Sequence, residues 1–533
     1  MTDVRRKPVV LIIRDGWGEN PHSEWNHANA IHLAATPVAD QLMKQYPNVL
    51  IHTSGEDVGL PVGVMGNSEV GHQNIGAGRI VDQEVMRITR AIRNGSFFEN
   101  ETLLGAIEHV RQSGGKLHLL GLMSDGRVHS DLEHAFAVVE LVKQSGLGTD
   151  QFAVHAITDG RDTSPTGGLD YVGRLQEKMS EHGVGHIASV IGRFYAMDRD
   201  LRWERVESAY KMLTEGVEQT FDSAADAIQN YYDNPTEPSR RGDEFITATT
   251  IKHNGQASVI SDGDAVIFLN YRGDRTRELT KAFTFPNDQW KAIDGGGFER
   301  GKKIDNLYFA TMTGYETGLP VQVIFEKPAK MPNILGQYVS GLGLHQFRCA
   351  ETEKYPHVTF FFNDYRDDPF SEEERGMAAS PRDVSTYDQK PEMSAEEVTQ
   401  RVLGDIKSGQ SHLIVVNYAN GDMVGHTGVV DAATQAVEKV DACVGRVVEA
   451  TLAKGGSLVV TADHGNCEQM IDPVTGGPHT AHTTYDVPLI VVEAGLEEKQ
   501  LREGGRLADI APTVLELMGL PKPEEMTGES LLK

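Results

Sequence analysis

The chain has 533 residues, of which 39% are hydrophobic, so it can bury at least one complete core and is expected to form two domains. Its formal net charge of −27 disfavours a nucleic acid or an anionic membrane as a partner. The three cysteines, Cys349, Cys443 and Cys467, form no CxxC pair, which excludes a disulfide framework and a cysteine-rich zinc module and favours a reducing compartment, the cytoplasm.

The first predicted element is a short strand near the N-terminus. Basic residues at the start precede an apolar run, as they would in a signal peptide, but the run covers only residues 9–13 before Arg14 and Asp15 interrupt it. No other run approaches the roughly 18 apolar residues that span a bilayer. We therefore expect a soluble protein.

Short apolar runs recur along the chain and alternate with stretches of helical periodicity. The runs are PVVLII, LHLLGL, FAVHAI, HIASVI, AVIFLN, VTFFF (358–362), HLIVV, SLVV and VPLIVV, and a helical period follows Gly428. This alternation predicts an α/β fold with mostly parallel, buried strands. The polar segments 233–244 and 294–303 are expected to be surface loops, and 326–332 a linker.

Acidic and histidine residues follow the predicted strands in the outer parts of the chain. Asp15 follows the first strand, whereas two later strands are followed by Asp422 with His426 and by Asp463 with His464. Ligands of open parallel sheets bind beyond the carboxyl ends of the strands. An Asp-His pair there is commonly a structural cap, and each segment alone is a weak signal.

Taken together with HTAHTTYD, these segments provide ligands for two metal ions. That segment contributes His482, whereas its neighbour His479 is expected to support a ligand or the structure. Carboxylate and imidazole donors without thiolate suit Mn²⁺ or Zn²⁺, and the oxygen-rich set favours Mn²⁺.

The segment GVMGNSEVGHQNIGAG (63–78) presents Ser68 in a glycine-rich turn with His72 nearby. A free serine hydroxyl is a poor nucleophile and needs a base or a metal to take its proton. The pattern is not the G-x-S-x-G elbow of α/β-hydrolases, so metal activation for attack on phosphorus is the better account. The structural alternative is that Ser68 only caps a helix.

The middle of the chain places arginines beside strand-end turns. They are Arg161, Arg193, Arg199, Arg272 and Arg275. Guanidinium groups bind carboxylate and phosphate bidentately, so this cluster indicates a small anionic substrate, although solvated surface arginines are the alternative. Asp162 could move a proton to and from a substrate hydroxyl or could merely hold an arginine. Lys354, expected immediately before a strand, could stabilise charge on a phosphoryl group or lie on the surface.

Several motifs occur in the order typical of one enzyme family. RDGWG, MGNSEVGH, SDGRVHSD, TDGRDTSP, GRFYAMDRD, NYRGDR, AETEKYPHVTFFF, NGDMVGHTG, TADHGN and PHTAHTT together resemble the cofactor-independent phosphoglycerate mutases over essentially the whole chain. The chain departs from the common family pattern at Arg14, where an apolar residue often precedes DGWG, and at Gly273.

The resemblance implies an alkaline-phosphatase-like phosphatase domain with a mostly parallel sheet, formed by residues 1–82 and 331–533. An α/β transferase domain, 87–322, is inserted into it, with hinge linkers at 83–86 and 323–330. It also implies two Mn²⁺ ions, with Zn²⁺ or Co²⁺ as alternatives. One ion would be bound by Asp422, His426 and His482, and the other by Asp15, Ser68, Asp463 and His464.

The implied reaction interconverts 3-phosphoglycerate and 2-phosphoglycerate without 2,3-bisphosphoglycerate. Ser68 would carry the phosphoryl group, Asp162 would shuttle the proton, and Lys354 would assist the transfer. The family's substrate-binding positions match His129, Asp159, Arg161, Asp162, Arg193, Arg199, Arg272, Arg275 and Lys354. The resemblance further implies a cytoplasmic monomer.

The main alternative is another two-metal phosphomutase or phosphomonoesterase of the same superfamily. A phosphopentomutase is disfavoured by the serine at position 68 and by the large insert, and a hydrolase would not need so many arginines. A catalytically silent metal-binding protein is disfavoured because every proposed ligand is present.

Overall fold

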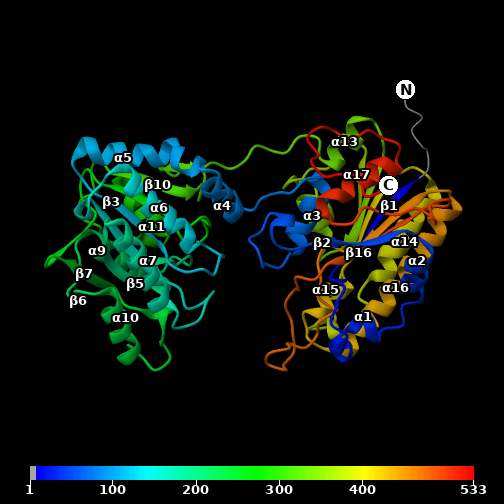
Figure 1. The fold of residues 1–533 in the computed structure, drawn as a ribbon, viewed down its shortest axis with the longest axis horizontal. Helices are drawn as coiled ribbons and strands as arrows, with labels where there is room; N and C mark the ends of the chain where they lie inside the picture. Colours follow the sequence, from blue (N-terminus) through cyan, green and yellow to red (C-terminus); the bar gives the residue numbers. More distant parts are fainter. Residues whose placement is uncertain (1–7) are drawn as a thin grey trace. The chain divides into compact units, whose positions relative to one another are not determined.

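A computed structural model describes residues 8–533 of the chain (Figure 1). The basic residues that bear on the signal-peptide question belong to positions 1–7 and lie outside the described residues. The chain divides into two compact units, one formed by Met1–Met86 with Ala329–Lys533 and the other by Arg87–Pro328. The chain first passes from one unit to the other after Met86, within helix α4 (Glu84–Asn94), which begins inside the hinge expected at 83–86. Of the second expected hinge, 323–330, residues 323–325 belong to strand β11 (Gln322–Phe325).

The first unit is built on an eight-stranded sheet in the order β13-β12-β14-β1-β15-β16-β2-β17. Its strands are β1 (Val9–Arg14), β2 (Asn48–His52), β12 (Gln346–Glu351), β13 (Glu373–Ala378), β14 (Leu413–Tyr418), β15 (Ser457–Thr461), β16 (Val487–Val492) and β17 (Gly505–Arg506). The pairs from β13 to β15 are parallel, and only β16 runs against its neighbours. Every residue of β1, β14 and β15 is buried, as expected for central parallel strands covered on both faces.

Helices cover both faces of this sheet, as Figure 1 shows for α3 and α17 on one face and α14 and α16 on the other. The helices of the unit are α1 (Ala30–Leu33), α2 (Pro37–Gln45), α3 (Ser68–Ala77), α13 (Leu335–Gly341), α14 (Ala395–Ser408), α15 (Asn420–Gly425), α16 (Val430–Ala453) and α17 (Ile510–Leu517). Helix α16 confirms the helical period predicted after Gly428. Its valines and alanines pack into one continuous core with the sheet.

The second unit contains a nine-stranded sheet in the order β11-β10-β9-β3-β4-β5-β7-β6, with β8 beside β7. Its further strands are β3 (Leu117–Leu122), β4 (Phe152–Thr158), β5 (His186–Gly192), β6 (Thr220–Phe221), β7 (Thr249–His253), β8 (Gln256–Ala257), β9 (Ala265–Phe268) and β10 (Tyr308–Thr313). The strands from β11 to β5 are all parallel. The mostly parallel sheets of both units confirm the predicted α/β class.

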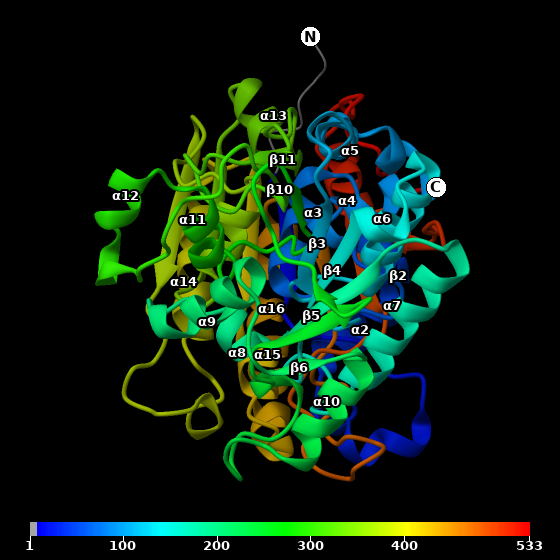
Figure 2. The ribbon, with the colours of Figure 1, turned by 90° about the vertical axis from the view of Figure 1, so that its left-hand side faces the viewer.

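Helices also lie on both faces of the second sheet. Figure 2 shows α6 and α7 on one face and α9 and α11 on the other. The helices of this unit are α5 (Glu101–Ser113), α6 (Leu132–Ser145), α7 (Gly168–His182), α8 (Arg193–Ala196), α9 (Trp203–Thr214), α10 (Ala224–Asp233), α11 (Arg277–Thr284) and α12 (Asn287–Lys291). An aromatic cluster that includes Trp203, Phe268, Phe283 and Trp290 fills the core beneath α9 and α11.

The prediction of a strand over residues 358–362 was wrong. Residues His357–Phe361 form a π-helix, with Pro356 at its N-cap in the helical conformation. The Thr359 hydroxyl donates to the carbonyl of Tyr355, and the helix packs against α3. Aromatic and β-branched residues favour strands only where a pleated surface is available, and packing against α3 overrides that preference here.

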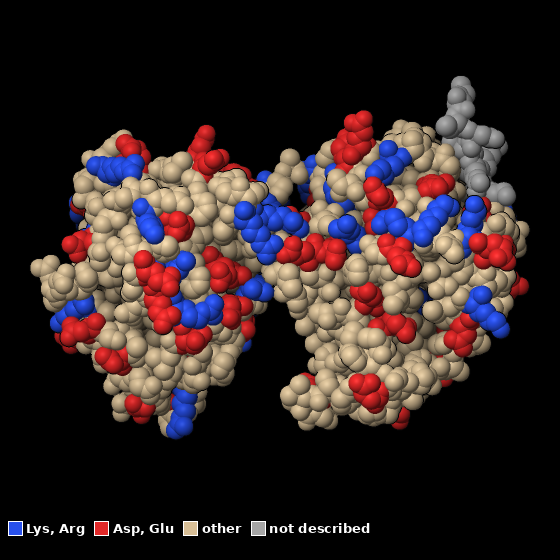
Figure 3. Space-filling view, in the orientation of Figure 1, with Lys and Arg blue, Asp and Glu red and all other residues tan. Residues whose placement is uncertain are grey.

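The surface carries both signs of charge, and the three cysteines form no disulfide. On the face in Figure 3, acidic and basic side chains are interspersed over both units. Cys349, Cys443 and Cys467 are free and buried. Among residues 8–533, no helix has both the length and the apolar character that crossing a membrane requires.

The central position of β1 makes a test of the first unit's core. Leu11 is fully buried in β1, whereas Leu33 is 47% exposed. We expect Leu11→Ala to lower the free energy of unfolding of this unit by about 2–5 kcal/mol, because the lost side chain leaves a cavity in a closely packed core. The control Leu33→Ala should change it by less than about 0.5 kcal/mol. Equal effects of the two substitutions in urea unfolding would contradict the assigned core.

Candidate functional site

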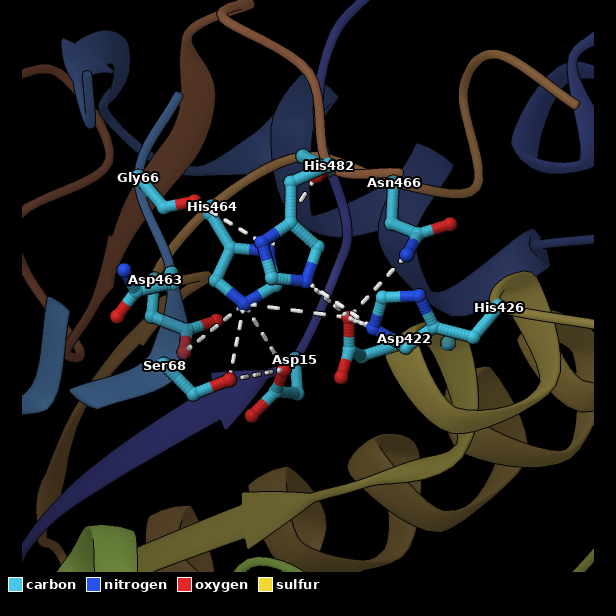
Figure 4. A network of polar contacts seen from close by, with 12 residues as sticks. Asp15, Gly66, Ser68, Asp422, His426, Asp463, His464, Asn466 and His482 are labelled. Atoms are coloured by element: carbon cyan, nitrogen blue, oxygen red, sulfur yellow. Dashed lines mark hydrogen bonds and ion pairs between the residues drawn. The ribbon is translucent and has the colours of Figure 1, made fainter. Parts of the chain in front are cut away.

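The carboxyl ends of three adjacent parallel strands, β14, β1 and β15, bring most of the predicted metal ligands of the first unit together. β1 lies between β14 and β15, with Ile13 opposite Asn417 on one side and Thr461 on the other. Asp15 follows β1, Asp463 and His464 follow β15, and Asp422 lies in α15 just after β14. Figure 4 shows these side chains converging with His426 and His482. The common strand direction therefore places residues from both ends of the chain at one edge.

Ser68 points into this group of side chains from the first turn of α3. The helix cap is Asn67, whose side chain accepts the amide of Val70, so the Ser68 hydroxyl is left for the site. Ser68 Oγ lies 3.3 Å from Asp15 Oδ1 and 3.0 Å from His464 Nε2. The preceding turn needs Gly66, because a Cβ there would collide with the carbonyl of Thr53.

Three histidines share one orientation. The Nδ1 atoms of His426, His464 and His482 contact the backbone carbonyls of Thr480 at 2.7 Å, Gly465 at 3.3 Å and Gly66 at 2.9 Å. A neutral imidazole that donates from Nδ1 carries its lone pair on Nε2. All three Nε2 atoms then face the carboxylates of the site as potential metal ligands, the arrangement found when a backbone carbonyl orients a metal-binding histidine.

The distances around Asp422 fit a divalent cation. Asp422 Oδ1 lies 3.2 Å from His426 Nε2 and 3.0 Å from His482 Nε2, and these two nitrogens are 3.1 Å apart. With Nδ1 as the donor on each ring, these three atoms are all electron-pair donors, and a shared cation relieves their repulsion. The hydrogen bond to Asp422 raises the pKa of His426 against a smaller opposing effect of burial. Burial would lower the pKa of His482, but its interactions with Asp422 outweigh burial and raise it.

Asp15 and Asp463 form a second group of donors. Asp463 is fully buried, and neither of its carboxylate oxygens accepts a hydrogen bond from the part of the chain that is described. Its Oδ2 lies 3.6 Å from His464 Nε2 and 3.2 Å from His72 Nδ1. Burial, together with the Asp463 and Asp422 carboxylates, raises the pKa of Asp15. A buried carboxylate without a hydrogen-bond donor, as at Asp463, fits a site that binds a cation.

Lys354 supplies the positive charge nearest to Ser68. Its Nζ donates to Asp15 Oδ1 at 2.8 Å, to Asp422 Oδ2 at 2.6 Å and to Ser68 Oγ at 2.5 Å. Burial would lower the pKa of this ammonium group, but the Asp15 and Asp422 carboxylates outweigh it and raise the pKa above its ordinary value. In turn, Lys354 and the histidines hold the pKa of Asp422 well below its ordinary value against the effect of burial.

The residue patterns alone did not assign several residues that orient the ligands. Asn417 donates to Asp15 Oδ2 at 2.7 Å, and Asn466 donates to Asp422 Oδ1 at 3.2 Å. His72, noted only as a neighbour of Ser68, lies one helical turn after it, where its Nδ1 contacts the carbonyl of Ser68 at 2.8 Å. Among these, only the spacing of Ser68 and His72 on one helix face is visible in the sequence.

Glu468 holds together the segments that carry the ligands. Its carboxylate accepts the amides of Gly18 at 3.0 Å and Asn466 at 2.8 Å, as well as the hydroxyl of Thr483. Gly18 lies after β1, Asn466 lies after β15, and Thr483 is next to His482. Glu468 therefore ties its own segment to the loop that carries His482 and to the distant segment after β1, and the contact with Gly18, 450 positions away, could not be inferred from sequence patterns.

The second unit places its polar residues at the carboxyl ends of β9, β3, β4 and β5. Arg193 Nη1 contacts Asp159 Oδ1 at 2.7 Å and Asp162 Oδ2 at 2.5 Å. The Asp162 Oδ2 atom also lies 3.9 Å from His129 Nε2. The carboxylate of Asp159 is buried and further accepts the hydroxyl of Ser124 at 2.7 Å, and these donors lower its pKa although burial alone would raise it.

Two further arginines share the carboxylate of Asp274. Arg199 Nη1 lies 3.1 Å from its Oδ2, and Arg272 Nε lies 3.1 Å from its Oδ1. Arg161 pairs with Glu244 at 3.1 Å. Each of these arginines is exposed to solvent while it is held by a carboxylate, which is compatible with a role in binding an incoming anion.

A cavity of about 420 Å³ in this unit is lined by Arg161, Arg193, Arg199 and Arg275, together with Arg202, Arg205 and three carboxylates. Burial, followed by repulsion from Arg199 and Arg193, lowers the pKa of Arg275. Burial and Arg193 likewise lower the pKa of His129 to about 4, so this imidazole is neutral near pH 7. Mutually repelling guanidinium groups at a cavity favour an anionic ligand.

Comparisons with known proteins identify the family. Residues 7–522 match the Metalloenzyme superfamily. The chain is 74% identical to a 2,3-bisphosphoglycerate-independent phosphoglycerate mutase of Rhodopirellula baltica, with 100% of this chain and 98% of the relative covered. It is 50% identical to a protein of the same name from Syntrophotalea carbinolica over the full length of both.

A solved structure gives the same result. The phosphoglycerate mutase of Leishmania mexicana, determined at low cobalt concentration, matches with a TM-score of 0.61 and 30% identity, covering 100% of this chain and 99% of that one. The superfamily and the candidate ligand groups support divalent-metal binding. The chain thus belongs to the 2,3-bisphosphoglycerate-independent phosphoglycerate mutases of the Metalloenzyme superfamily.

Proposed function

We propose that the protein interconverts 3-phosphoglycerate and 2-phosphoglycerate, with Ser68 as the transient carrier of the phosphoryl group. The observation that carries this proposal is the position of Ser68 Oγ, within 3.3 Å of Asp15, His464 and Lys354. A serine hydroxyl becomes an effective nucleophile only when its proton is removed and its negative charge is stabilised. The Lys354 ammonium group, which donates to Ser68 Oγ, stabilises that charge.

Two divalent ions, Mn²⁺ by preference, would occupy the two donor groups. Asp422, His426 and His482 would bind one, and Asp15, Ser68, Asp463 and His464 the other. Zn²⁺ and Co²⁺ suit the same donors, but the number of carboxylate oxygens favours Mn²⁺. Ions bound there would acidify the serine hydroxyl and offset charge on the phosphoryl oxygens.

Lys354 would stabilise the phosphoryl group during transfer. Its raised pKa keeps the ammonium group charged throughout the physiological pH range. It already contacts the nucleophile and one carboxylate of each donor group. A fixed cation in a buried site stabilises developing negative charge much more strongly than one in water.

The second unit would bind the glycerate. Arg161, Arg193, Arg199, Arg272 and Arg275, with His129, would hold its carboxylate and phosphate while the two hydroxyls exchange the phosphoryl group. Asp159 would contribute by holding Arg193 in place. Asp162, in contact with Arg193 and 20% exposed at its side chain, would take the proton from one hydroxyl and return it to the other. Neutral His129 could donate a hydrogen bond without adding charge.

The Ser68 proposal predicts loss of turnover together with loss of a covalent intermediate. Ser68→Ala should lower kcat for conversion of 3-phosphoglycerate to 2-phosphoglycerate by about 10³-fold or more, because no other hydroxyl can replace the nucleophile. Mass spectrometry of acid-quenched wild-type enzyme should find phosphate on the peptide containing Ser68. The exposed Ser371→Ala is the control and should retain wild-type kcat. Turnover that survives Ser68→Ala would contradict the phosphoserine route, and release of inorganic phosphate in place of 2-phosphoglycerate would indicate a hydrolase.

The metal assignment predicts that two histidines of one loop differ in their effect. His482→Ala should weaken Mn²⁺ binding by about 100-fold or more, whereas His479→Ala should change it little. Isothermal titration calorimetry on metal-free protein measures both. Equal losses in the two variants would contradict the assignment.

Metal binding should also weaken as the pH falls. The pKa values of His426 and His482 are raised above the ordinary 6.5 of histidine. As the pH falls, protons therefore begin to compete with the metal for these nitrogens while the pH is still above 6.5. The pKa of Asp422 is lowered, so this carboxylate stays ionised throughout that range. The Mn²⁺ dissociation constant should therefore increase as the pH is lowered from 8 to 6, and a constant value would contradict this account.

The arginine assignment predicts a defect in substrate binding. Arg193→Lys should raise KM by about 10- to 100-fold, because lysine keeps the charge but loses the planar pair of donors. Arg174→Lys, which alters a surface ion-pair group on α7, is the matched control. Steady-state kinetics with 3-phosphoglycerate provides the measurement, and an unchanged KM for Arg193→Lys would exclude Arg193 from substrate binding.

A further inference from the structure

A second cavity, of about 340 Å³, lies within the first unit beside the end of β1. Arg14, residues 17–20, several residues between 26 and 43, and Pro488 line it. None of the proposed metal ligands or substrate-binding residues is among them. The lining includes one buried cation, Arg14, with the amides of Asn26 and Asn29 and the imidazole of His32.

Arg14 is a buried cation whose hydrogen-bonding capacity is not used by the protein. The residue is 2% exposed, and its Nε and Nη2 atoms make no hydrogen bond to any of residues 8–533. Its guanidinium carbon lies 4.3 Å from the centre of the Trp17 ring, so the indole covers one face of the guanidinium group. A stacked guanidinium keeps its edge donors available.

Asp441, the carboxylate that attracts Arg14, already accepts hydrogen bonds from backbone amides. Asp441 attracts Arg14, although burial dominates and lowers the pKa of Arg14 to about 10, which leaves the group charged near pH 7. Both oxygens of Asp441 accept backbone amides from the start of α2, Val38 N at 2.9 Å and Ala39 N at 2.8 Å. A buried charge without hydrogen-bonded partners is costly, and a bound counter-ion removes that cost.

We propose that this cavity binds a small oxyanion, a carboxylate or inorganic phosphate, through the guanidinium group of Arg14. The edge of a guanidinium matches the paired oxygens of both groups. Asn26, Asn29 and His32 line the same cavity and can add hydrogen bonds. Glu19 and Asp40 also line it, but both are exposed at its outer side, where they disfavour a large polyanion. The inference is independent of the proposed function.

Trp17 provides a local signal for the test. The metal-loaded full-length protein is titrated with sodium phosphate and, separately, with sodium acetate, at constant ionic strength maintained with chloride, while tryptophan fluorescence is followed. We expect a saturable change with at least one of the two anions, and the stronger response identifies the preferred oxyanion. The change should be absent in Trp17→Phe, which keeps an aromatic face but removes the signal.

Substitutions at Arg14 separate this site from anion binding elsewhere. Arg14→Leu should abolish the saturable change, and Arg14→Lys, which keeps the charge but loses the planar edge, should weaken binding by at least about 10-fold. If Arg14→Leu does not fold, the Arg14→Lys titration alone decides. No saturable response in the wild type, or wild-type affinity in either Arg14 variant, would overturn the proposal.

Discussion

The active region of the first unit depends on the repulsion among buried carboxylates that converge at one edge of a parallel sheet. Asp15, Asp422 and Asp463 are almost completely withdrawn from water. Lys354 contacts Asp15 and Asp422, and the lone-pair nitrogens of three histidines face the same space. Bound cations would stabilise an arrangement with this many electron-pair donors, so the fold and the proposed chemistry share one electrostatic requirement.

The second unit instead concentrates positive charge. Its strand ends bring arginines together. Carboxylates such as Asp159 and Asp274 hold most of them, and Arg275 donates to the carbonyl of Met197. These partners keep the guanidinium groups in place while the excess of arginine at the cavity keeps its preference for an anion. The proposed division of the chemistry between a cation-binding unit and an anion-binding unit suits a reaction that transfers a phosphoryl group within a small acid.

Strand ends explain why much of the site could be predicted from the sequence. Asp15, Asp463 and His464 each come directly after a buried apolar run, and parallel strands place such residues at one edge. The resemblance to a known family supplied the division of the ligands between two ions and the identity of the substrate. Patterns could not predict the orientation of His426, His464 and His482, because the carbonyls that fix their rings belong to Thr480, Gly465 and Gly66.

Tertiary packing also overrode one local prediction, since residues 358–362 have strand-forming side chains but belong to a helical segment against α3. The unpaired state of Arg14 likewise depends on Asp441, more than 400 positions away, being occupied by α2. Long-range contacts of this kind leave no local signal in the sequence.

The stoichiometry of Mn²⁺ binding tests the central claim most directly, because it counts the cations that the buried carboxylates require. Electron paramagnetic resonance of free Mn²⁺ during titration of the metal-free protein should show two ions bound per chain, and one or none in Asp422→Ala. A wild-type protein that binds fewer than two ions, or an Asp422→Ala variant that still binds two, would contradict the account.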